Sequence, residues 1–255
     1  MPQLARRFRS LIKQFIPERL QVLRVRWILW GVRKQYSTLS VGQAFNRIYR
    51  TKAWGATEGE IFFSGFGSDA QFAEPYVDWV RRFIAEENIR HVVDLGCGDF
   101  RVGRCICAGS GLSRYTGIDV VEDLIAHNQS QFGKDEIDFR VADITRDELP
   151  DGELCLIRQV FQHLSIAQIS QVLDRCKKYK FVVITEEVYK GEGCRPNLDK
   201  PHGPDTRVFD RSGVYLDFSP FRLSNKAVLE LPVSKRSVLR TSLVTADCVT
   251  QQTHS

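Results

Sequence analysis

The sequence has 255 residues, of which 43% are hydrophobic and 26% charged, with 18 glycines, 9 prolines and one methionine. This length suits one α/β domain with an extension, or two small domains, and the composition excludes a wholly disordered chain, a collagen or a disulfide mini-protein. The formal net charge of +5 is unevenly spread. Residues 1–36 hold nine Lys and Arg residues against one acid, a net charge of +8, whereas the remaining 27 basic and 30 acidic residues give −3. The basic character therefore belongs to an N-terminal arm and not to the body.

The seven cysteines predict free thiols in a reducing cytoplasm. Their number is odd, several lie in apolar runs, and no secretory signal is recognised ahead of them, so we expect no disulfide framework. Cys105 and Cys107 lack the four-ligand pattern of a zinc site. We therefore interpret the thiols as small buried apolar groups, and we predict no metal site.

Residues 1–40 are predicted to form a basic helical arm. Their longest apolar run, residues 27–32, is shorter than the roughly 20 residues that a membrane span needs. An arm of this composition can instead lie on an anionic membrane surface through residues 1–36, peripheral to the inner membrane. The alternative is a helical hairpin that packs on the domain or on a second copy. The sequence leaves both interpretations open, and with them the oligomeric state.

Residues 41–255 are predicted to form one domain. It opens with a short helix and an apolar loop up to residue 69, followed by a helix with Pro75 in its first turn. Apolar strands then alternate with helices. Strands are expected over residues 91–95, up to 119, 137–142, 154–157 and 181–185, and helices over about 101–109, 121–128 and 166–176. This alternation predicts a doubly wound, Rossmann-like α/β fold with a mostly parallel sheet covered on both faces.

The alternation stops after the fifth strand. Residues 188–222 contain four prolines and no apolar period. Because a long irregular segment after a strand's carboxyl end often covers an active site, we predict a lid-like insert there. Residues 228–233 and 237–244 are expected to form an antiparallel pair that closes the edge of the sheet.

The strongest functional signal is the turn between the first strand and the first helix, residues 94–103, with the sequence DLGCGDFRVG. Glycine in such a turn lets a ligand approach the backbone, because no Cβ obstructs it. Asp119 ends the second strand 21 residues after Gly98, where a doubly wound fold places an acid against ribose hydroxyls. Asp143 closes the third strand within reach of an adenine. These features on consecutive strand ends predict an adenosine cofactor.

The same turn favours S-adenosylmethionine over a dinucleotide. A dinucleotide fingerprint needs a small residue at the position of Arg101, and Asp99 would repel a pyrophosphate at the helix N-terminus. S-adenosylmethionine has no phosphate and carries an ammonium and a sulfonium. Acids in and before the turn therefore suit it.

These motifs resemble the class I S-adenosylmethionine-dependent methyltransferases over roughly residues 70–190. The resemblance is carried by DLGCG at 94–98, GID ending at Asp119, ADI around Asp143 and QHLS at 162–165. Further motifs resemble a bacterial branch associated with glycan and polysaccharide assembly: FNRIY at 45–49, WG at 54–55, SGFGS at 64–68, RQVFQHLS at 158–165, PNLDKP at 196–201 and SGV at 212–214. That branch implies an oxygen-methylating enzyme that acts on a sugar or glycolipid. One departure is Phe100, where many members of the class have a third glycine.

The resemblance implies cofactor roles for ten residues. Asp94 and the backbone of Gly96, Cys97 and Gly98 would hold the methionyl portion. Independently of the resemblance, Gly and Ser amides suit an anion, so the loop of residues 64–68 could close over the methionine carboxylate. The adenosine and sulfonium would be contacted by six others: Asp119 on the ribose, Val120, Asp143 and Ile144 at the adenine, and Arg158 and Gln159 close to the sulfonium. Simple turn capping is the alternative for the acids at 94 and 143, and a plain turn is the alternative for residues 64–68.

Methyl transfer is an in-line displacement, for which a protein chiefly aligns the acceptor with the methyl group and excludes water. A hydroxyl acceptor also benefits from a general base. We predict His163, just past the fourth strand, and Glu186, ending the fifth, as catalytic residues. Glu187 is a rival, as are His202 and Asp205 of the insert, and helix capping or packing is the structural alternative for His163.

We therefore predict a methyltransferase that uses S-adenosylmethionine to O-methylate a sugar, glycolipid or other small hydroxyl compound. An RNA methyltransferase is one alternative, but a body charge of −3 argues against a nucleic-acid partner. The other alternative is a non-catalytic cofactor-binding module held at the membrane by its arm.

Overall fold

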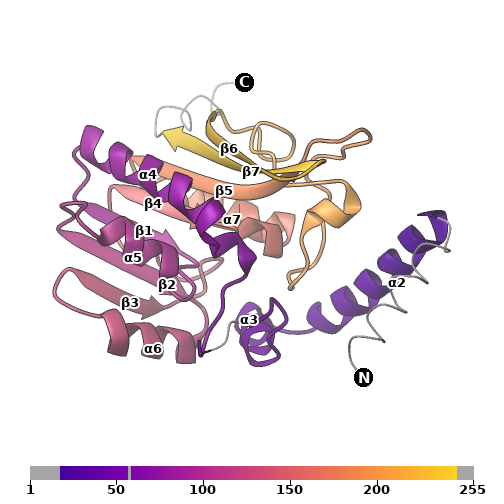
Figure 1. Ribbon diagram of the computed structural model, residues 1–255, viewed down its shortest axis with the longest axis horizontal. Helices are drawn as coiled ribbons and strands as arrows, with labels where there is room; N and C mark the ends of the chain where they lie inside the picture. Colours follow the sequence, from indigo (N-terminus) through magenta and orange to yellow (C-terminus); the bar gives the residue numbers. More distant parts are fainter. Residues whose placement is uncertain (1–17, 57–58, 246–255) are drawn as a thin grey trace.

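A seven-stranded sheet forms the centre of the protein in this computed structural model, which describes residues 18–56 and 59–245 (Figure 1). The strand order is β3-β2-β1-β4-β5-β7-β6. The strands are β1 (His91–Leu95), β2 (Arg114–Asp119), β3 (Ile137–Val141), β4 (Leu154–Arg158), β5 (Phe181–Tyr189), β6 (Lys226–Ser234) and β7 (Ser237–Thr245). Strands β1 to β5 run parallel, whereas β7 runs antiparallel to both β5 and β6. The predicted Rossmann-like sheet with an antiparallel edge pair is confirmed.

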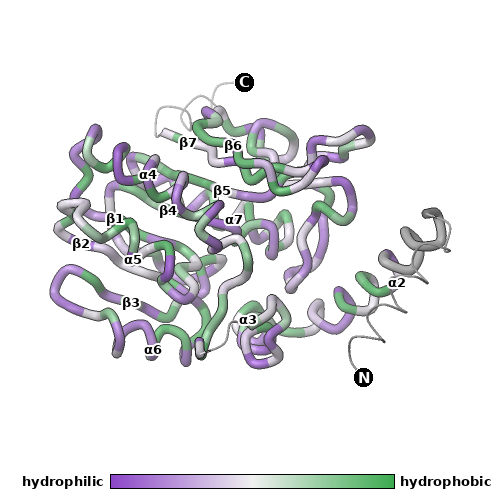
Figure 2. The backbone as a smooth tube through the Cα atoms, viewed as in Figure 1, coloured by the Kyte–Doolittle hydropathy of each residue, from purple (hydrophilic) through white to green (hydrophobic). Residues whose placement is uncertain are grey.

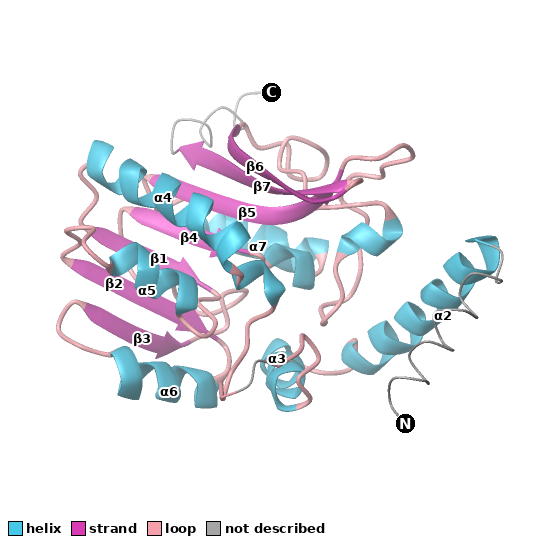
Figure 3. Ribbon diagram, viewed as in Figure 1, coloured by secondary structure: helices cyan, strands magenta, loops and turns pink. Residues whose placement is uncertain are grey.

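Helices cover both faces of this sheet (Figure 3). Helices α4 (Ala70–Glu86), α5 (Arg101–Cys107) and α6 (Glu122–Phe132) pack on one face, and α7 (Ile166–Cys176) packs on the other. Successive strand residues point to opposite faces, so Val92 joins the α4 side of the core and Val93 the α7 side. This two-sided burial explains why the central strands are apolar along most of their length (Figure 2).

The N-terminal helices differ in how they relate to this body. Helix α3 (Val41–Arg50) begins with a capping box, in which Ser40 and Gln43 each bind the other's backbone N–H, and it lies beyond the carboxyl ends of the parallel strands (Figure 1). Helix α2 (Glu18–Tyr36) projects away from the sheet and contacts the body through its last turns. Residues 1–17 of the predicted arm lie outside the described part of the chain.

Three predictions about local structure are wrong. Helix α4 begins at Ala70, so Pro75 lies in its second turn, where the ring removes one helical hydrogen bond. Strand β5 extends to Tyr189 because β7 pairs with it along all nine residues, and the irregular segment therefore starts at residue 190. Cys105 is exposed, unlike the buried Cys155 and Cys176; Cys248 lies outside the described residues.

Across residues 18–56 and 59–245, the structure contains no helix long and apolar enough to cross a membrane.

Candidate functional site

A cavity of about 340 Å³ opens at the carboxyl ends of the parallel strands. Strand order reverses between β1 and β4, which is where open α/β sheets bind ligands. The cavity is lined by all ten residues for which a cofactor role is predicted: Asp94, Gly96, Cys97, Gly98, Asp119, Val120, Asp143, Ile144, Arg158 and Gln159. Residues from four separate strand ends therefore meet at one site of the size that small ligands occupy.

The acidic residues of the cavity are held by hydrogen bonds. Asp94 accepts one from the Tyr115 hydroxyl at 2.5 Å, and Asp119 accepts two, from the backbone N–H groups of Gly98 (3.2 Å) and Val121 (3.1 Å). Burial raises the pKa of Asp94 and of Asp119 to about 6. Asp143 accepts two hydrogen bonds from Thr145 and so also caps its own turn.

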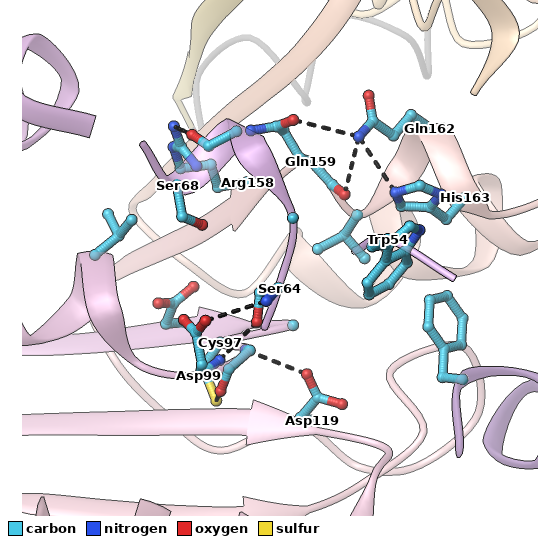
Figure 4. A pocket seen from close by; sticks show the side chains of 18 of the residues that line it. Trp54, Ser64, Ser68, Cys97, Asp99, Asp119, Arg158, Gln159, Gln162 and His163 are labelled. Carbon is cyan, nitrogen blue, oxygen red and sulfur yellow. Dashed lines mark hydrogen bonds between the residues drawn. The ribbon is translucent and has the colours of Figure 1, made fainter. Parts of the chain in front are cut away.

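The glycine-rich turn is shaped by close contacts that leave no room for a Cβ. Gly96 has φ +77°, and a Cβ there would lie 2.4 Å from Cγ2 of Val160. Gly98 has φ +56°, and a Cβ there would lie 2.4 Å from Oγ of Ser64. The Ser64 hydroxyl also accepts a hydrogen bond from the backbone N–H of Asp99 at 2.8 Å, which ties the 64–68 loop to the turn (Figure 4).

Phe100 keeps the backbone conformation that a third glycine would adopt. Its φ is +59°, in the left-handed region, and its side chain is fully buried. The ring packs against Tyr115, Phe132 and Phe139, with centroid distances of 5.2, 5.3 and 4.8 Å. Burial of a large aromatic side chain offsets the roughly 1 kcal/mol cost of left-handed backbone. The departure from the family pattern therefore leaves the turn intact.

We expect Gly96→Ala to lower both stability and ligand affinity at this cavity by more than Gly111→Ala does. The two glycines share a positive φ, +77° and +70°, but a Cβ at Gly111 meets nothing within 4 Å. Gly111→Ala should therefore cost about 1 kcal/mol for backbone strain alone, and Gly96→Ala the same plus the clash with Val160. Urea unfolding of both variants measures the difference; equal losses would show that the contact with Val160 is unimportant.

Three polar side chains at and just after the end of β4 line the cavity, those of Arg158, Gln159 and Gln162. The Arg158 guanidinium donates to the Gly67 carbonyl at 2.6 Å and lies 5.1 Å from the centre of the Tyr76 ring. Gln162 Nε2 lies 3.4 Å from Gln159 Oε1 (Figure 4). Within the described part of the chain, the buried atoms Arg158 Nε and Gln162 Oε1 have no hydrogen-bond partner. Such atoms on a cavity wall are suited to a ligand.

Aromatic side chains cover the other half of the cavity. Phe45 and Tyr49 come from α3, and the Trp54 ring lies 4.8 Å from the His163 ring and 5.5 Å from that of Tyr49 (Figure 4). The Trp54 indole N–H donates to the Pro204 carbonyl at 3.1 Å. This hydrogen bond joins the segment after α3 to the predicted lid.

His163 lines the cavity as a neutral imidazole. Burial lowers its pKa to about 3, with the positive charge of Lys200 acting in the same direction. Nδ1 lies 3.1 Å from the Gly203 carbonyl, which can only accept, so Nδ1 carries the proton. Nε2 is then an acceptor, and the Gln162 amide N–H donates to it at 3.3 Å. A base this weak is better suited to orienting a hydroxyl than to removing its proton.

In the described part of the chain, the structure places Glu186, a predicted catalytic residue, at the turn that follows β4 and outside the cavity lining. Its carboxylate accepts hydrogen bonds from three consecutive backbone N–H groups at the start of the turn Phe161–His163: Val160 at 3.0 Å, Phe161 at 2.8 Å and Gln162 at 2.9 Å. Burial raises the pKa of Glu186 to about 8, against the lowering effect of these bonds. Neighbouring Glu187 does line the cavity, and its carboxylate accepts a hydrogen bond from Ser237.

Arg207 binds the same turn from the opposite side. Its buried guanidinium donates to the carbonyls of Phe161 (3.0 Å), Gln162 (3.3 Å), Leu164 (2.6 Å) and Leu198 (2.9 Å). Glu186 therefore holds the N–H groups and Arg207 the carbonyls of the turn that presents Gln162 and His163 to the cavity.

The insert contributes to the cavity through residues other than those predicted. Pro204 and Thr206 line it, whereas Nε2 of His202 donates to the Leu39 carbonyl (3.0 Å) and Asp205 pairs with Arg33 (2.8 Å). The latter two residues hold the insert against the N-terminal helices. Tyr76 and Gln162 also line the cavity, which the sequence does not predict: the helical spacing of Tyr76 indicates a core position, and Gln162 is only one member of the QHLS motif.

Among the described residues, no group of three or more His, Cys, Asp or Glu side chains is placed to hold a metal ion.

Comparison with known proteins defines the class of this fold. Residues 92–179, from β1 to just beyond α7, match a family model described as a methyltransferase domain. No curated protein matches the chain. The sheet and its flanking helices form the Rossmann-like methyltransferase fold, as the resemblance to class I methyltransferases predicts.

Two solved structures illustrate this similarity. One is the N-methyltransferase NodS from Bradyrhizobium japonicum WM9 in complex with S-adenosyl-L-homocysteine, with 13% identity and a TM-score of 0.55 over 77% of this chain and 97% of that one. The other is the N-terminal domain of EvdMO1 with S-adenosylhomocysteine bound, with 14% identity and a TM-score of 0.51 over 75% of this chain and 85% of that one. At these identities the similarity is one of fold.

Proposed function

We propose that this protein transfers the methyl group of S-adenosylmethionine to a hydroxyl of a sugar, glycolipid or other small acceptor. The observation that carries the proposal is the single cavity lined by all ten predicted cofactor residues. A methyltransferase domain match over residues 92–179 supports the reaction class.

The residues of the cavity fit the cofactor group by group. Asp119 would accept hydrogen bonds from the ribose hydroxyls, and Val120, Asp143 and Ile144 would contact the adenine; all four line the cavity. The buried carboxylate of Asp94 suits the ammonium of the methionyl portion. Arg158 lies against the Gly67 carbonyl of the 64–68 loop, so its positive charge and its unpaired Nε suit the methionine carboxylate. This proposed role of Arg158 differs from the predicted one beside the sulfonium, because a guanidinium there would repel the positively charged sulfur.

The acceptor half of the site supports a hydroxyl compound. The cofactor would supply a methyl group already activated by the sulfonium. Trp54 offers a ring face against which the C–H face of a sugar can pack, and Gln159, Gln162 and Glu187 offer hydrogen-bonding groups for its hydroxyls. The unprotonated Nε2 of His163 would orient the reacting hydroxyl in place of the Gln162 amide, and Glu187 is a carboxylate of the cavity that could receive its proton.

Ligand-dependent melting and methyl transfer test the function. S-adenosylhomocysteine should raise the melting temperature, whereas NAD should not; the reverse ranking would remove the proposal. Labelled S-adenosylmethionine with cell-envelope glycolipid should then give a labelled product that His163→Ala reduces. Cofactor binding without transfer to glycolipid or to small sugars would favour the non-catalytic module. Transfer to RNA would favour the nucleic-acid alternative.

We expect the affinity for S-adenosylhomocysteine to fall as the pH drops below about 6. Asp119 and Asp94 have pKa values raised to about 6 by burial, and each must be ionised to accept the ribose hydroxyls or pair with the ammonium. Protonation of each carboxylate therefore lowers the affinity for the ligand about tenfold for each pH unit below the pKa of that carboxylate. Isothermal titration calorimetry between about pH 5 and pH 8 measures this slope, and Asp119→Asn should make it shallower. An affinity that stays constant over this range would contradict these roles.

A further inference from the structure

Helix α2 presents an exposed aromatic and basic face. Trp27 and Trp30 are 73% and 59% exposed, and a Cβ added at Gly31 would meet nothing within 4 Å. Lys34 is also exposed, and its ammonium lies 5.2 Å from the centre of the Trp30 ring. These four positions follow the spacing i, i+3, i+4 and i+7, so they share one side of the helix. We call this side the Trp27–Lys34 face.

The opposite side of α2 is fastened to the body. Tyr36 is buried in a cluster with Ala44 and Ile48 of α3, and Val32 packs against it. Arg33 pairs with both Asp205 (2.8 Å) and Asp210 of the insert. The last turns of α2 therefore hold it to the body while the rest projects from the sheet (Figure 1), and the residues of the Trp27–Lys34 face stay solvent-exposed or partly so.

We propose that the Trp27–Lys34 face of α2 docks on an anionic lipid membrane surface. Tryptophan concentrates at membrane–water interfaces, and exposed Lys and Arg beside it attract acidic headgroups. Arg26 and Lys34 are exposed here, and the whole of residues 1–36 carries a net charge of +8. The neighbouring Ile28, 48% exposed, adds an aliphatic side chain that the acyl region can take up.

Two other occupants fit this face less well. A second copy docked symmetrically would bring two strongly basic arms together, which like-charge repulsion opposes. A nucleic acid would use the positive charge but gains little from the exposed Ile28 that flanks the face. A bilayer surface uses the aromatic, aliphatic and basic groups together.

Co-sedimentation of the full chain with vesicles tests this proposal. We expect binding to vesicles of phosphatidylcholine with phosphatidylglycerol and much weaker binding to phosphatidylcholine alone. The double variant Trp27→Ala, Trp30→Ala should reduce binding about tenfold or more, because it removes both interfacial rings. Phe218→Ala, at an exposed aromatic residue of another segment, is the matched control and should bind like the unmodified chain.

The readouts separate this proposal from the methyltransferase function. The double variant should retain its melting shift with S-adenosylhomocysteine, which shows that it is folded; vesicle binding is expected with or without that ligand. Unchanged vesicle binding in the double variant would overturn the proposal, as would equal binding to both kinds of vesicle. A dimer in light scattering that the double variant converts to a monomer, without vesicle binding in either form, would assign the face to a second copy instead.

Discussion

Replacement of Arg207 by methionine is expected to lower the free energy of unfolding by about 3–5 kcal/mol. The side chain is 1% exposed and donates to four backbone carbonyls on two segments. Methionine fills a similar volume but has no hydrogen-bond donor, so the four carbonyls lose their partner. Glu186, on the other side of the turn, loses the favourable electrostatic interaction with this buried cation. Each buried polar group left unsatisfied costs about 1–3 kcal/mol.

Urea unfolding of the Arg207→Met variant measures this loss, and two further variants make the result interpretable. Arg211→Met alters an exposed arginine of the same segment and should change stability by less than about 0.5 kcal/mol. Arg207→Lys keeps the charge, but a single ammonium cannot reach all four carbonyls, so an intermediate loss is expected. If Arg207→Met were as stable as Arg211→Met, the Phe161–His163 turn would not depend on this guanidinium.

Replacement of Asp119 by asparagine is expected to weaken binding of S-adenosylhomocysteine about a hundredfold. Two charge-assisted hydrogen bonds to ribose hydroxyls, at about 1.5–3 kcal/mol each, would be lost or weakened. The carboxylate also accepts from Gly98 and Val121, so the variant disturbs the glycine-rich turn as well.

Calorimetric titration measures this affinity, with Asp123→Asn as the matched control. Asp123 is an exposed acid four residues further along the chain and should leave the affinity unchanged. The melting temperature of each variant without ligand separates a loss of fold from a loss of affinity. A well-folded Asp119→Asn variant that binds as tightly as the unmodified chain would exclude a ribose contact at this position.

The meeting of the ten proposed cofactor residues at one cavity was predictable from the sequence because its signals are local. A buried strand, a glycine-rich turn and an acid at the next strand end follow each other within 30 residues, and parallel strands bring their carboxyl ends together. The placement of Asp94, Asp119 and Asp143 follows from that rule once the strands are recognised.

The rest of the cavity, where the acceptor is proposed to bind, was less predictable because it depends on long-range pairing. Glu186 and Glu187 are adjacent in a strand and point to opposite sides, so one lines the cavity and the other binds the Phe161–His163 turn. The strand reaches them only because β7 pairs alongside, more than 50 residues later in the chain. Arg207 lies in a segment with no periodicity, and three of its four carbonyl partners are over 40 residues away.

Phe100 also affects the rigidity of the ligand-binding turn. One residue supplies both the left-handed backbone of the glycine-rich turn and a ring in the aromatic core. The backbone of the turn therefore cannot change conformation unless the Phe100 ring leaves the core. The amide hydrogens of the turn are expected to exchange with solvent only when the whole domain unfolds. Little conformational entropy is then lost at the turn when a ligand arrives, so this part of the site is rigid before binding.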